Sequence, residues 1–310
     1  MDTRRIGSLR VSAVGLGCNN FGWHIDEAAS REVIHAALDA GITHFDTAAA
    51  YGDGESERIL GRALGGRRAG VVIATKFGNR TSTAPDAVKA QCEDSLRRLG
   101  TDRIDLFYLH KPNAETPIAD TLGALDDLVR EGKVREIACS NLSPEQLREA
   151  DRAAGDGARF VALQNEYSLL HRAPEAGTLQ ACEERGLAFV PFFPLKSGLL
   201  TGKYRRGAAA PAGSRLSGRE GSYFADYRDR VLTEENLEAV ERLIGFAERR
   251  GHTVLELAFS WLLARPAVAS VIAGATKPEQ VRANVAAAGW RLTEADLAAL
   301  DEAVPARSVA

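Results

Sequence analysis

Residues 71–110 read VVIATKFGNRTSTAPDAVKAQCEDSLRRLGTDRIDLFYLH and contain a strand, a helix and a second strand in succession. The first run, VVIAT (71–75), and the last, IDLFYLH (104–110), are apolar on successive residues, as expected of strands buried on both faces. Between them, apolar residues recur at helical spacing over 88–99, and the glycine that follows ends the pattern. This stretch therefore predicts two parallel strands joined by a crossover helix.

Six further apolar runs extend this alternation along the chain. They are SAVGLG (12–17), ITHFD (42–46), REIACS (135–140), FVALQN (160–165), LAFVPF (187–192) and VASVIAG (268–274). Helical patterns lie between most of them, and SPEQ (143–146) has the N-cap, first-turn proline and capping-box glutamine of a helix start. Eight strands separated mostly by helices predict a closed (β/α)8 TIM barrel that forms a single domain over residues 1–310. An open, doubly wound sheet is the alternative that this pattern allows.

Three segments fall outside the alternation. RRIGSLRVS (4–12) precedes the first barrel strand and predicts a small β-hairpin around Gly7-Ser8. Residues 203–232 are rich in Gly, Ala, Arg and Tyr, and because they follow the seventh strand we expect them to overhang the barrel mouth. Residues 235–264 hold two helical patterns in tandem.

Composition limits the possible functions. The formal net charge of −3 and the pI of about 6.1 give no bulk attraction for nucleic acid or an anionic membrane. The four cysteines are scattered without a CxxC pair or a Cys/His cluster, so we expect free thiols, a cytoplasmic location and no metal site. The chain has no long apolar run and no signal-peptide pattern, so neither a membrane span nor secretion is expected.

Four residues with acid–base chemistry end early strand runs or follow them closely. Asp46 ends THFD, Tyr51 comes five residues later, Lys76 follows VVIAT, and His110 ends IDLFYLH. Adjacent parallel strands lie about 4.8 Å apart, and their carboxyl ends form the face where barrel enzymes place their active sites. We therefore expect these four side chains to meet at one point.

This set of residues suits the reduction of a carbonyl group. A tyrosine with an ordinary pKa near 10 is a weak acid at neutral pH, and a neighbouring Lys76 ammonium would lower that pKa. Asp46 would keep Lys76 charged and in place, and His110 could donate a hydrogen bond that orients the carbonyl oxygen. Each residue alone has an ordinary structural explanation. Chance is a much poorer explanation for the presence of all four residues on one face.

The segments around these residues resemble the aldo-keto reductase family. The matching segments are DTAAAYG (46–52), VVIATKFG (71–78), DLFYLHKPN (105–113), CSN (139–141), QNEYSLL (164–170), PLKSGLLTGKY (194–204) and GATKPEQVRAN (274–284). The resemblance covers nearly the whole chain and implies a (β/α)8 barrel whose opposite end is plugged by the hairpin. It also implies that Tyr51 is the general acid/base, that Lys76 and Asp46 tune it, and that His110 orients the substrate.

A nicotinamide cofactor extended across the carboxyl-end face is a further implication of the resemblance. Ser140, Asn141 and Gln164 match the residues that bind the nicotinamide carboxamide, and their side chains supply the donors and acceptors that an amide needs. Phe192 stands where the family usually has a ring-stacking tyrosine, and Phe193 adds bulk beside it. The remaining candidate cofactor contacts are Leu195, Gly274, Thr276, Lys277, Gln280 and Asn284.

The other end of the cofactor is expected at the start of the last of these segments. Pro278 reads as the first helical position, so Lys277 is the N-cap, and lysine cannot accept a hydrogen bond from the helix amides. The helix end therefore stays open to a phosphate. Since the family generally prefers NADPH, we expect NADP(H), with NAD(H) as the alternative because Gln280 and Thr276 stand where many members have arginine.

The resulting hypothesis is an oxidoreductase that interconverts an aldehyde or ketone and an alcohol by direct hydride transfer. Asn20, Trp23 and Phe77 are expected to contact the small-molecule carbonyl or alcohol substrate. One alternative is a cofactor-binding sensor or subunit of the same fold with negligible turnover. A second is a barrel lyase or isomerase that uses no nicotinamide. Neither nucleic acid nor a membrane is expected as a partner.

Overall fold

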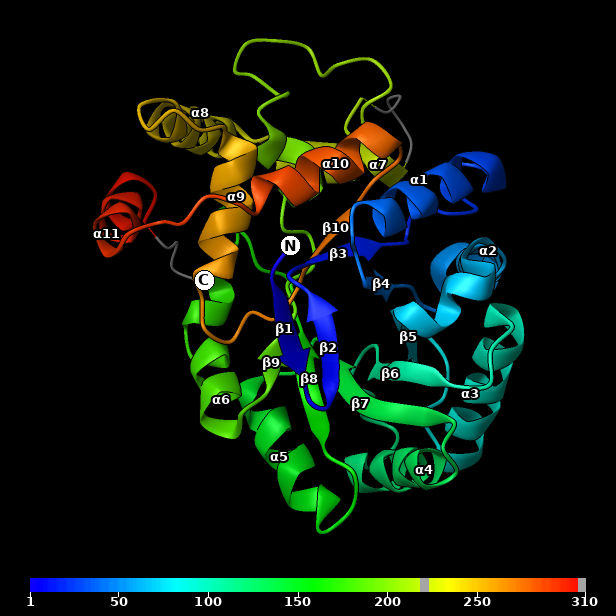
Figure 1. The fold of residues 1–310 in the computed structure, drawn as a ribbon. Helices are drawn as coiled ribbons and strands as arrows, with labels where there is room; N and C mark the ends of the chain where they lie inside the picture. Colours follow the sequence, from blue (N-terminus) through cyan, green and yellow to red (C-terminus); the bar gives the residue numbers. More distant parts are fainter. Residues whose placement is uncertain (218–222, 306–310) are drawn as a thin grey trace.

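The chain alternates strands and helices after an N-terminal hairpin, in the computed structural model that describes residues 1–217 and 223–305 (Figure 1). The strands are β1 (Thr3–Ile6), β2 (Leu9–Ser12), β3 (Val14–Gly17), β4 (His44–Asp46), β5 (Val72–Phe77), β6 (Ile104–Leu109), β7 (Val134–Ser140), β8 (Phe160–Gln164), β9 (Ala188–Phe189) and β10 (Val271–Gly274). The α-helices are α1 (Glu27–Asp39), α2 (Glu55–Leu64), α3 (Pro85–Leu99), α4 (Ile118–Arg130), α5 (Pro144–Ala154), α6 (Thr178–Arg185), α7 (Tyr223–Val231), α8 (Glu234–Glu248), α9 (Val254–Leu263), α10 (Pro278–Ala287) and α11 (Glu294–Ala303). Short 3-10 helices are η1 (Tyr51–Gly54), η2 (Gly65–Gly70), η3 (Ala173–Glu175) and η4 (Lys196–Thr201).

Strands β3 to β10 form one eight-stranded parallel sheet with the order β10-β3-β4-β5-β6-β7-β8-β9. Strands that follow one another in sequence are neighbours in the sheet, as short crossovers through helices produce. Hydrogen bonds join the two edges, because the Phe189 N–H donates to Ala267 O at 2.7 Å and the Ala269 N–H donates to Phe189 O at 2.9 Å. The sheet therefore closes on itself, and the predicted (β/α)8 barrel is confirmed over the open, doubly wound alternative.

The last two barrel strands are shorter than the apolar runs that predicted them. β9 covers only two residues of the run 187–192. Hydrogen bonds to β8 and the residue after it continue past β9, because the Val190 N–H donates to Leu163 O at 2.9 Å and the Phe192 N–H donates to Asn165 O at 3.1 Å. β10 begins at Val271, and closing contacts lie on both sides of its start, because the Ala269 N–H donates to Phe189 O and the Ile272 N–H donates to Pro191 O at 3.3 Å.

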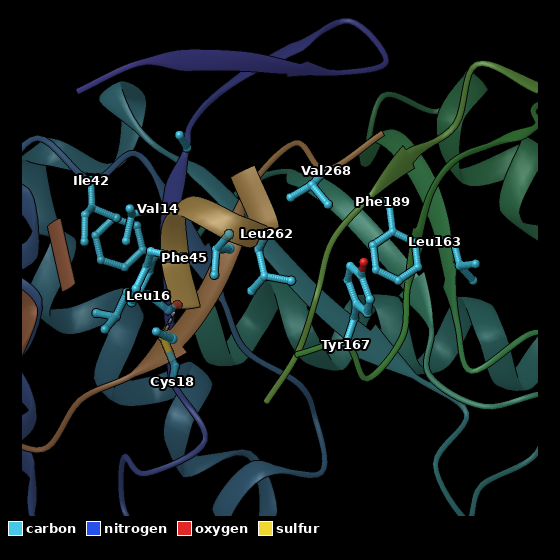
Figure 2. Packing of buried hydrophobic residues seen from close by; sticks show 14 of the residues in the cluster. Val14, Leu16, Cys18, Ile42, Phe45, Leu163, Tyr167, Phe189, Leu262 and Val268 are labelled. Atoms are coloured by element: carbon cyan, nitrogen blue, oxygen red, sulfur yellow. Dashed lines mark hydrogen bonds between the residues drawn. The ribbon is translucent and has the colours of Figure 1, made fainter. Parts of the chain in front are cut away.

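Alternation along each strand separates two apolar layers. Outward-facing residues pack beneath the helices in a large cluster, and Figure 2 shows members of it that include Phe45, Leu163 and Phe189. Inward-facing residues such as Val72 and Leu106 form a second cluster inside the barrel. Because both faces of the strands are buried, the strand runs are apolar on successive residues rather than on alternate ones.

The hairpin of β1 and β2 closes the amino end of the barrel. Its Ile6, Leu9 and Val11 side chains are 0%, 1% and 0% exposed and belong to the inner cluster. The turn requires Gly7, because its φ is +54° and a Cβ at this position would lie 2.7 Å from Glu136 Oε1. The hairpin therefore acts as the plug that the family resemblance implied.

The other segments outside the alternation have distinct structures. Residues 203–217 have no regular helix, the later part of the predicted long stretch forms α7, and residues 218–222 lie outside the described residues. The tandem helices predicted over 235–264 are α8 and α9. The predicted start of α5 is confirmed by a capping box at Ser143. Among the described residues, none of the helices is both long enough and apolar enough to cross a membrane.

Candidate active site

The four predicted acid–base residues lie at the carboxyl ends of three neighbouring strands. Asp46 is the last residue of β4, Lys76 precedes the last residue of β5, and His110 directly follows β6. Tyr51 begins η1 in the connection between β4 and α2. The structure thus brings all four to one end of the barrel interior.

The Lys76 ammonium is the centre of this group. Its side chain is 1% exposed, and Nζ donates to Asp46 Oδ1, to Thr47 O at 2.9 Å and to the Tyr51 hydroxyl at a long 3.5 Å. An ammonium has three N–H donors, so each has an acceptor. Burial would lower the pKa of Lys76, but the charges and hydrogen bonds of Asp46 and Tyr51 raise it above its usual value. The ammonium is therefore charged at neutral pH and fixed beside the phenol.

Lys76 lowers the pKa of Tyr51 as expected, but the net shift of this pKa is upward. Burial raises this pKa above its usual value near 10, and the Lys76 charge opposes the rise without cancelling it. The physical reason is that a phenolate removed from water loses more solvation than it regains from an ammonium already neutralised by Asp46. The phenol is therefore protonated at neutral pH, which is the form that can donate a proton.

His110 is a neutral imidazole beside the phenol. Its ring centroid lies 6.1 Å from that of Tyr51, with the ring planes at 86°. Burial, aided by the Lys76 charge, lowers the pKa of His110 to about 3. Its Nδ1 is buried and has no hydrogen-bond partner in the described part of the chain. A neutral ring keeps one N–H, which it can offer to an oxygen bound next to Tyr51.

Ser140, Asn141 and Gln164 meet where β7 and β8 end. Ser140 Oγ donates to Gln164 O at 2.7 Å, while Asn141 Nδ2 donates to His110 O and to Ser140 Oγ at 2.9 Å each. Gln164 Nε2 donates to Asp46 Oδ2 at 2.8 Å. These contacts leave the side-chain oxygens of Asn141 and Gln164 as acceptors for an amide NH2 group. To bind the carboxamide oxygen as well, Ser140 or Asn141 would have to turn one of its hydrogen-bond donors toward that oxygen.

Phe192 lies just past β9, at the mouth of the barrel. It forms a parallel bridge with Glu166, the second residue after β8, and its side chain is partly exposed. The Phe193 ring packs edge-on against it, with centroids 5.3 Å apart and planes at 78°. Leu195 is partly buried at the start of η4. The aromatic bulk expected beside Phe192 is therefore present.

The start of α10 has the features expected of a phosphate-binding helix end. Lys277 is the N-cap and makes no capping hydrogen bond, and Pro278 follows it in the first turn. Gln280 Oε1 instead accepts from the Thr276 N–H at 2.8 Å and from Thr276 Oγ1 at 3.2 Å. Lys277 is exposed, so its ammonium is accessible beside the helix N-terminus.

Two of the predicted substrate contacts lie in the segment that follows β3. Trp23 is 59% exposed. Asn20 is buried, donating from Nδ2 to Ala275 O at 3.2 Å and accepting at Oδ1 from Arg215 at 2.6 Å. A Cβ at Gly274 would lie 3.2 Å from Asn20 Nδ2, so this glycine keeps the ends of β3 and β10 close. Asn20 thus ties the barrel mouth to the 203–217 segment.

The structure does not bring Phe77 to the site. Its side chain is 1% exposed in the cluster beneath the helices and packs against Phe107, with ring centroids 4.7 Å apart. Because side chains alternate along β5, Phe77 points away from the interior that Lys76 enters. Asn284 is also buried, in the second turn of α10.

Two buried contacts near the site are not predicted by the sequence. The Arg215 guanidinium is largely removed from water, which lowers its pKa, and it reaches Asn20 from a segment without regular pattern. Glu57 is 0% exposed and accepts from Thr75 Oγ1 and from Arg98, which fixes α2 against β5. A helical glutamate normally reads as a solvated charge, so no sequence signal marked Glu57.

A surface hollow of about 480 Å³ lies elsewhere, between α2 and α3. It is lined by Arg58, Arg62, Asp94, Arg97 and Arg98. Each of these guanidinium groups has a carboxylate partner, so the hollow carries little unbalanced charge. It is a poorer candidate site than the barrel mouth.

Comparison with known proteins assigns the family. Residues 13–305 match the model of the Aldo/keto reductase family. The chain is 35% identical over 296 residues to the L-glyceraldehyde 3-phosphate reductase of Escherichia coli (strain K12), covering 90% of this chain and 84% of that protein. Among solved structures, the glycerol dehydrogenase AKR11B4 from Gluconobacter oxydans superposes with a TM-score of 0.84 at 32% identity, covering 99% of this chain and 97% of that one. The holo form of aldo-keto reductase AKR11C1 from Bacillus halodurans gives 0.81 at 31% identity, with the same coverage.

The chain therefore belongs to the aldo-keto reductase family. The resemblance seen in the sequence is confirmed. Members of this family are oxidoreductases that act on aldehydes and ketones and generally use a nicotinamide cofactor.

Proposed function

We propose that this single-domain protein reduces an aldehyde or ketone to an alcohol, and catalyses the reverse oxidation, with Tyr51 as the general acid/base. The observation that carries the proposal is the continuous set of contacts from Asp46 through Lys76 to the Tyr51 hydroxyl, with His110 packed against the phenol. A proton donor, its charged partner and a neutral hydrogen-bond donor thus share one end of the barrel interior.

Each member of this group has a distinct task in carbonyl reduction. Tyr51 gives its proton to the carbonyl oxygen as negative charge develops there. Lys76 stabilises the phenolate that remains, and Asp46 balances the ammonium. The neutral His110 donates a hydrogen bond to the same oxygen and orients it. For the reverse reaction Tyr51 must first lose its proton, so alcohol oxidation should rise with pH toward and beyond 10.

The residues around this group fit a nicotinamide cofactor. The Gln164 and Asn141 oxygens can accept from a carboxamide NH2, and Phe192 offers an aromatic face at the barrel mouth. When bound, the nicotinamide supplies the hydride in reduction and accepts it in oxidation. Lys277 and the uncapped start of α10 would hold a phosphate, which favours NADPH over NADH. The remaining contacts proposed for the cofactor are Ser140, Leu195, Gly274, Thr276, Gln280 and Asn284.

Isotope transfer tests this function directly. The enzyme is incubated with an activated aromatic aldehyde and NADPH deuterated at C4 of the nicotinamide, one face at a time, and the alcohol is analysed by mass spectrometry. We expect deuterium in the alcohol from one of the two labelled cofactors. Absence of labelled alcohol across a broad carbonyl panel, with either NADPH or NADH, would contradict the proposal.

Isotope transfer together with a measurement of cofactor binding separates the alternatives. A sensor or subunit would bind NADPH, seen as quenching of tryptophan fluorescence, without forming alcohol. A lyase or isomerase that uses no nicotinamide would show neither quenching nor label transfer. The family assignment and the complete Asp46–Tyr51–Lys76–His110 group favour turnover over both.

A further inference from the structure

Two ion pairs hold the carboxyl end of β5, one on each face of the strand. On the inner face, Lys76 pairs with Asp46. On the outer face, the preceding residue Thr75 donates from Oγ1 to Glu57 Oε1 at 2.5 Å, and Glu57 Oε2 accepts from Arg98 of α3. Thr75 and Glu57 are both 0% exposed. Glu57 belongs to the first turn of α2, so this helix is attached to β5 next to the acid–base group.

The pairing of Glu57 with Arg98 is poorly explained by stability alone. Removing a carboxylate and a guanidinium from water costs about as much free energy as their attraction returns, and an apolar pair of similar volume would stabilise the fold as well. The charged pair instead defines a geometry, because each carboxylate oxygen of Glu57 has its own donor. We therefore looked for a neighbouring segment that depends on this geometry.

The three residues that follow Tyr51 have left-handed backbone conformations. Gly52, Asp53 and Gly54 have φ angles of 56°, 52° and 83°, and such a conformation is strained for a non-glycine residue such as Asp53. The start of the segment is held by the Tyr51 N–H, which donates to Ala48 O at 3.0 Å. Because the segment has no regular helical turn, its course depends on the contacts at its two ends.

The other end of this segment is held by the first turn of α2. Ser56 is 0% exposed, its Oγ donates to Cys18 O at 2.8 Å, and Thr47 Oγ1 lies 2.8 Å from the same oxygen. A Cβ at Gly54 would lie 2.5 Å from Arg98 Cδ, so Arg98 packs directly on the backbone of the segment. The partner of Glu57 thus also contacts the segment that carries the phenol.

We propose that Glu57 is a positioning residue that sets the place of Tyr51. Through Thr75 and Arg98 it holds β5, the first turn of α2 and the intervening segment in one arrangement. The Lys76 Nζ and the Tyr51 hydroxyl are 3.5 Å apart, which is already long for a hydrogen bond, so a small shift of α2 would separate them. This inference rests on the proposed function, since it takes Tyr51 as the general acid/base.

A matched pair of substitutions at Thr75 tests the inference. Loss of Glu57 itself would leave Arg98 without its partner, whereas Thr75→Val keeps the side-chain shape and removes only the hydroxyl. Thr75→Ser keeps the hydroxyl. Each variant is loaded with NADPH and mixed with an aromatic aldehyde, and the first turnover is followed by stopped flow. We expect the rate to fall about tenfold in Thr75→Val and less than about threefold in Thr75→Ser, with NADPH affinity within about twofold of the wild type in both.

The solvent isotope effect separates positioning from a loss of folded protein. A displaced phenol makes proton transfer more rate-limiting, so D2O should slow the first turnover of Thr75→Val by a larger factor than that of the wild type. A partly unfolded variant would instead lose amplitude and keep the wild-type rate and isotope effect. Either a wild-type rate in Thr75→Val, or a reduced rate with the wild-type isotope effect, would overturn the inference.

Thr43→Val is the matched control at the opposite end of the barrel. Thr43 Oγ1 accepts from the Ser12 N–H at 2.9 Å, just before β4, so the same substitution removes a hydrogen bond far from α2. Its first-turnover rate should stay within about twofold of the wild type, with an unchanged isotope effect. Equal slowing in Thr43→Val and Thr75→Val would contradict a specific role for Glu57. A wild type that shows no turnover would overturn the proposed function and this inference with it.

Discussion

Both ends of the barrel interior contain buried residues, but one end is apolar and the other is charged. At the amino end, Ile6 and Leu9 from the hairpin pack against Val72 in an apolar layer. At the carboxyl end, Asp46 and Lys76 are buried to the same degree but form an ion pair. Burial of apolar surface stabilises the fold by about 25 cal/mol per Å², whereas a buried ion pair roughly balances its own desolvation. The amino end thus supplies stability, and the carboxyl end supplies chemistry.

Disrupting the Asp46–Lys76 ion pair should have the largest effect on activity and stability. In Lys76→Met the phenolate loses its ammonium partner, so we expect carbonyl reduction to fall by about 10³-fold. The unpaired Asp46 carboxylate should also lower the free energy of unfolding by about 3–5 kcal/mol, measured by urea denaturation.

A paired substitution separates these two effects. In Lys76→Met/Asp46→Leu neither charge of this pair remains, but Gln164 Nε2 loses its acceptor, so the free energy of unfolding should recover to within about 1–3 kcal/mol of the wild type while activity stays low. Recovery of activity together with stability would show that the ion pair has no role in the reaction.

Breaking the apolar layer should affect stability alone. Leu9→Ala leaves a cavity beneath the barrel, and we expect the free energy of unfolding to fall by about 2–5 kcal/mol. At a temperature where the variant is folded, its kcat should stay within about twofold of the wild type, since the hairpin lies at the end opposite Tyr51. A large loss of kcat in the folded variant would contradict the division between the two ends.

His44 lies between the apolar layer and the Asp46–Lys76 pair. It should make the stability of the protein depend on pH. It is fully buried, and burial lowers its pKa from 6.5 to about 4. Between these two values the unfolded chain binds a proton that the folded chain does not, so stability falls as pH falls. From pH 6.5 to 5 the wild type should lose about 2 kcal/mol more than His44→Leu. Parallel pH curves for the two proteins would contradict this assignment.

The smallest effect is expected at the far end of the cofactor. Lys277→Ala removes one exposed charge from the start of α10, and we expect about a fivefold rise in the dissociation constant for NADPH. Binding of NADH is the matched control and should change by less than twofold, because NADH lacks the extra phosphate. Equal weakening of both cofactors would place Lys277 away from that phosphate.

The sequence predicted the features that depend on strand order. All eight barrel strands were found from apolar runs, because burial on both faces leaves a clear signal. The meeting of Asp46, Tyr51, Lys76 and His110 followed from their positions at strand ends, since the carboxyl ends of parallel strands share one face.

Features that depend on side-chain packing were not predictable. The net rise in the Tyr51 pKa depends on how deeply the phenol is buried, which strand positions do not reveal. The sequence predicts Phe77 as a substrate contact, but alternation along β5 turns its side chain outward. The Asp46–Gln164 bond joins strands on different sides of the barrel, so no local pattern marks it.

A stopped-flow measurement tests the central claim, that Tyr51 delivers the proton. The wild type and Tyr51→Phe are each loaded with NADPH and mixed with an aromatic aldehyde, and the first turnover is followed by nicotinamide absorbance. Phenylalanine keeps the ring but removes the acidic hydroxyl, so the transfer rate should fall at least about 10²-fold while NADPH binding stays within twofold. Equal first-turnover rates in the two proteins would contradict the account.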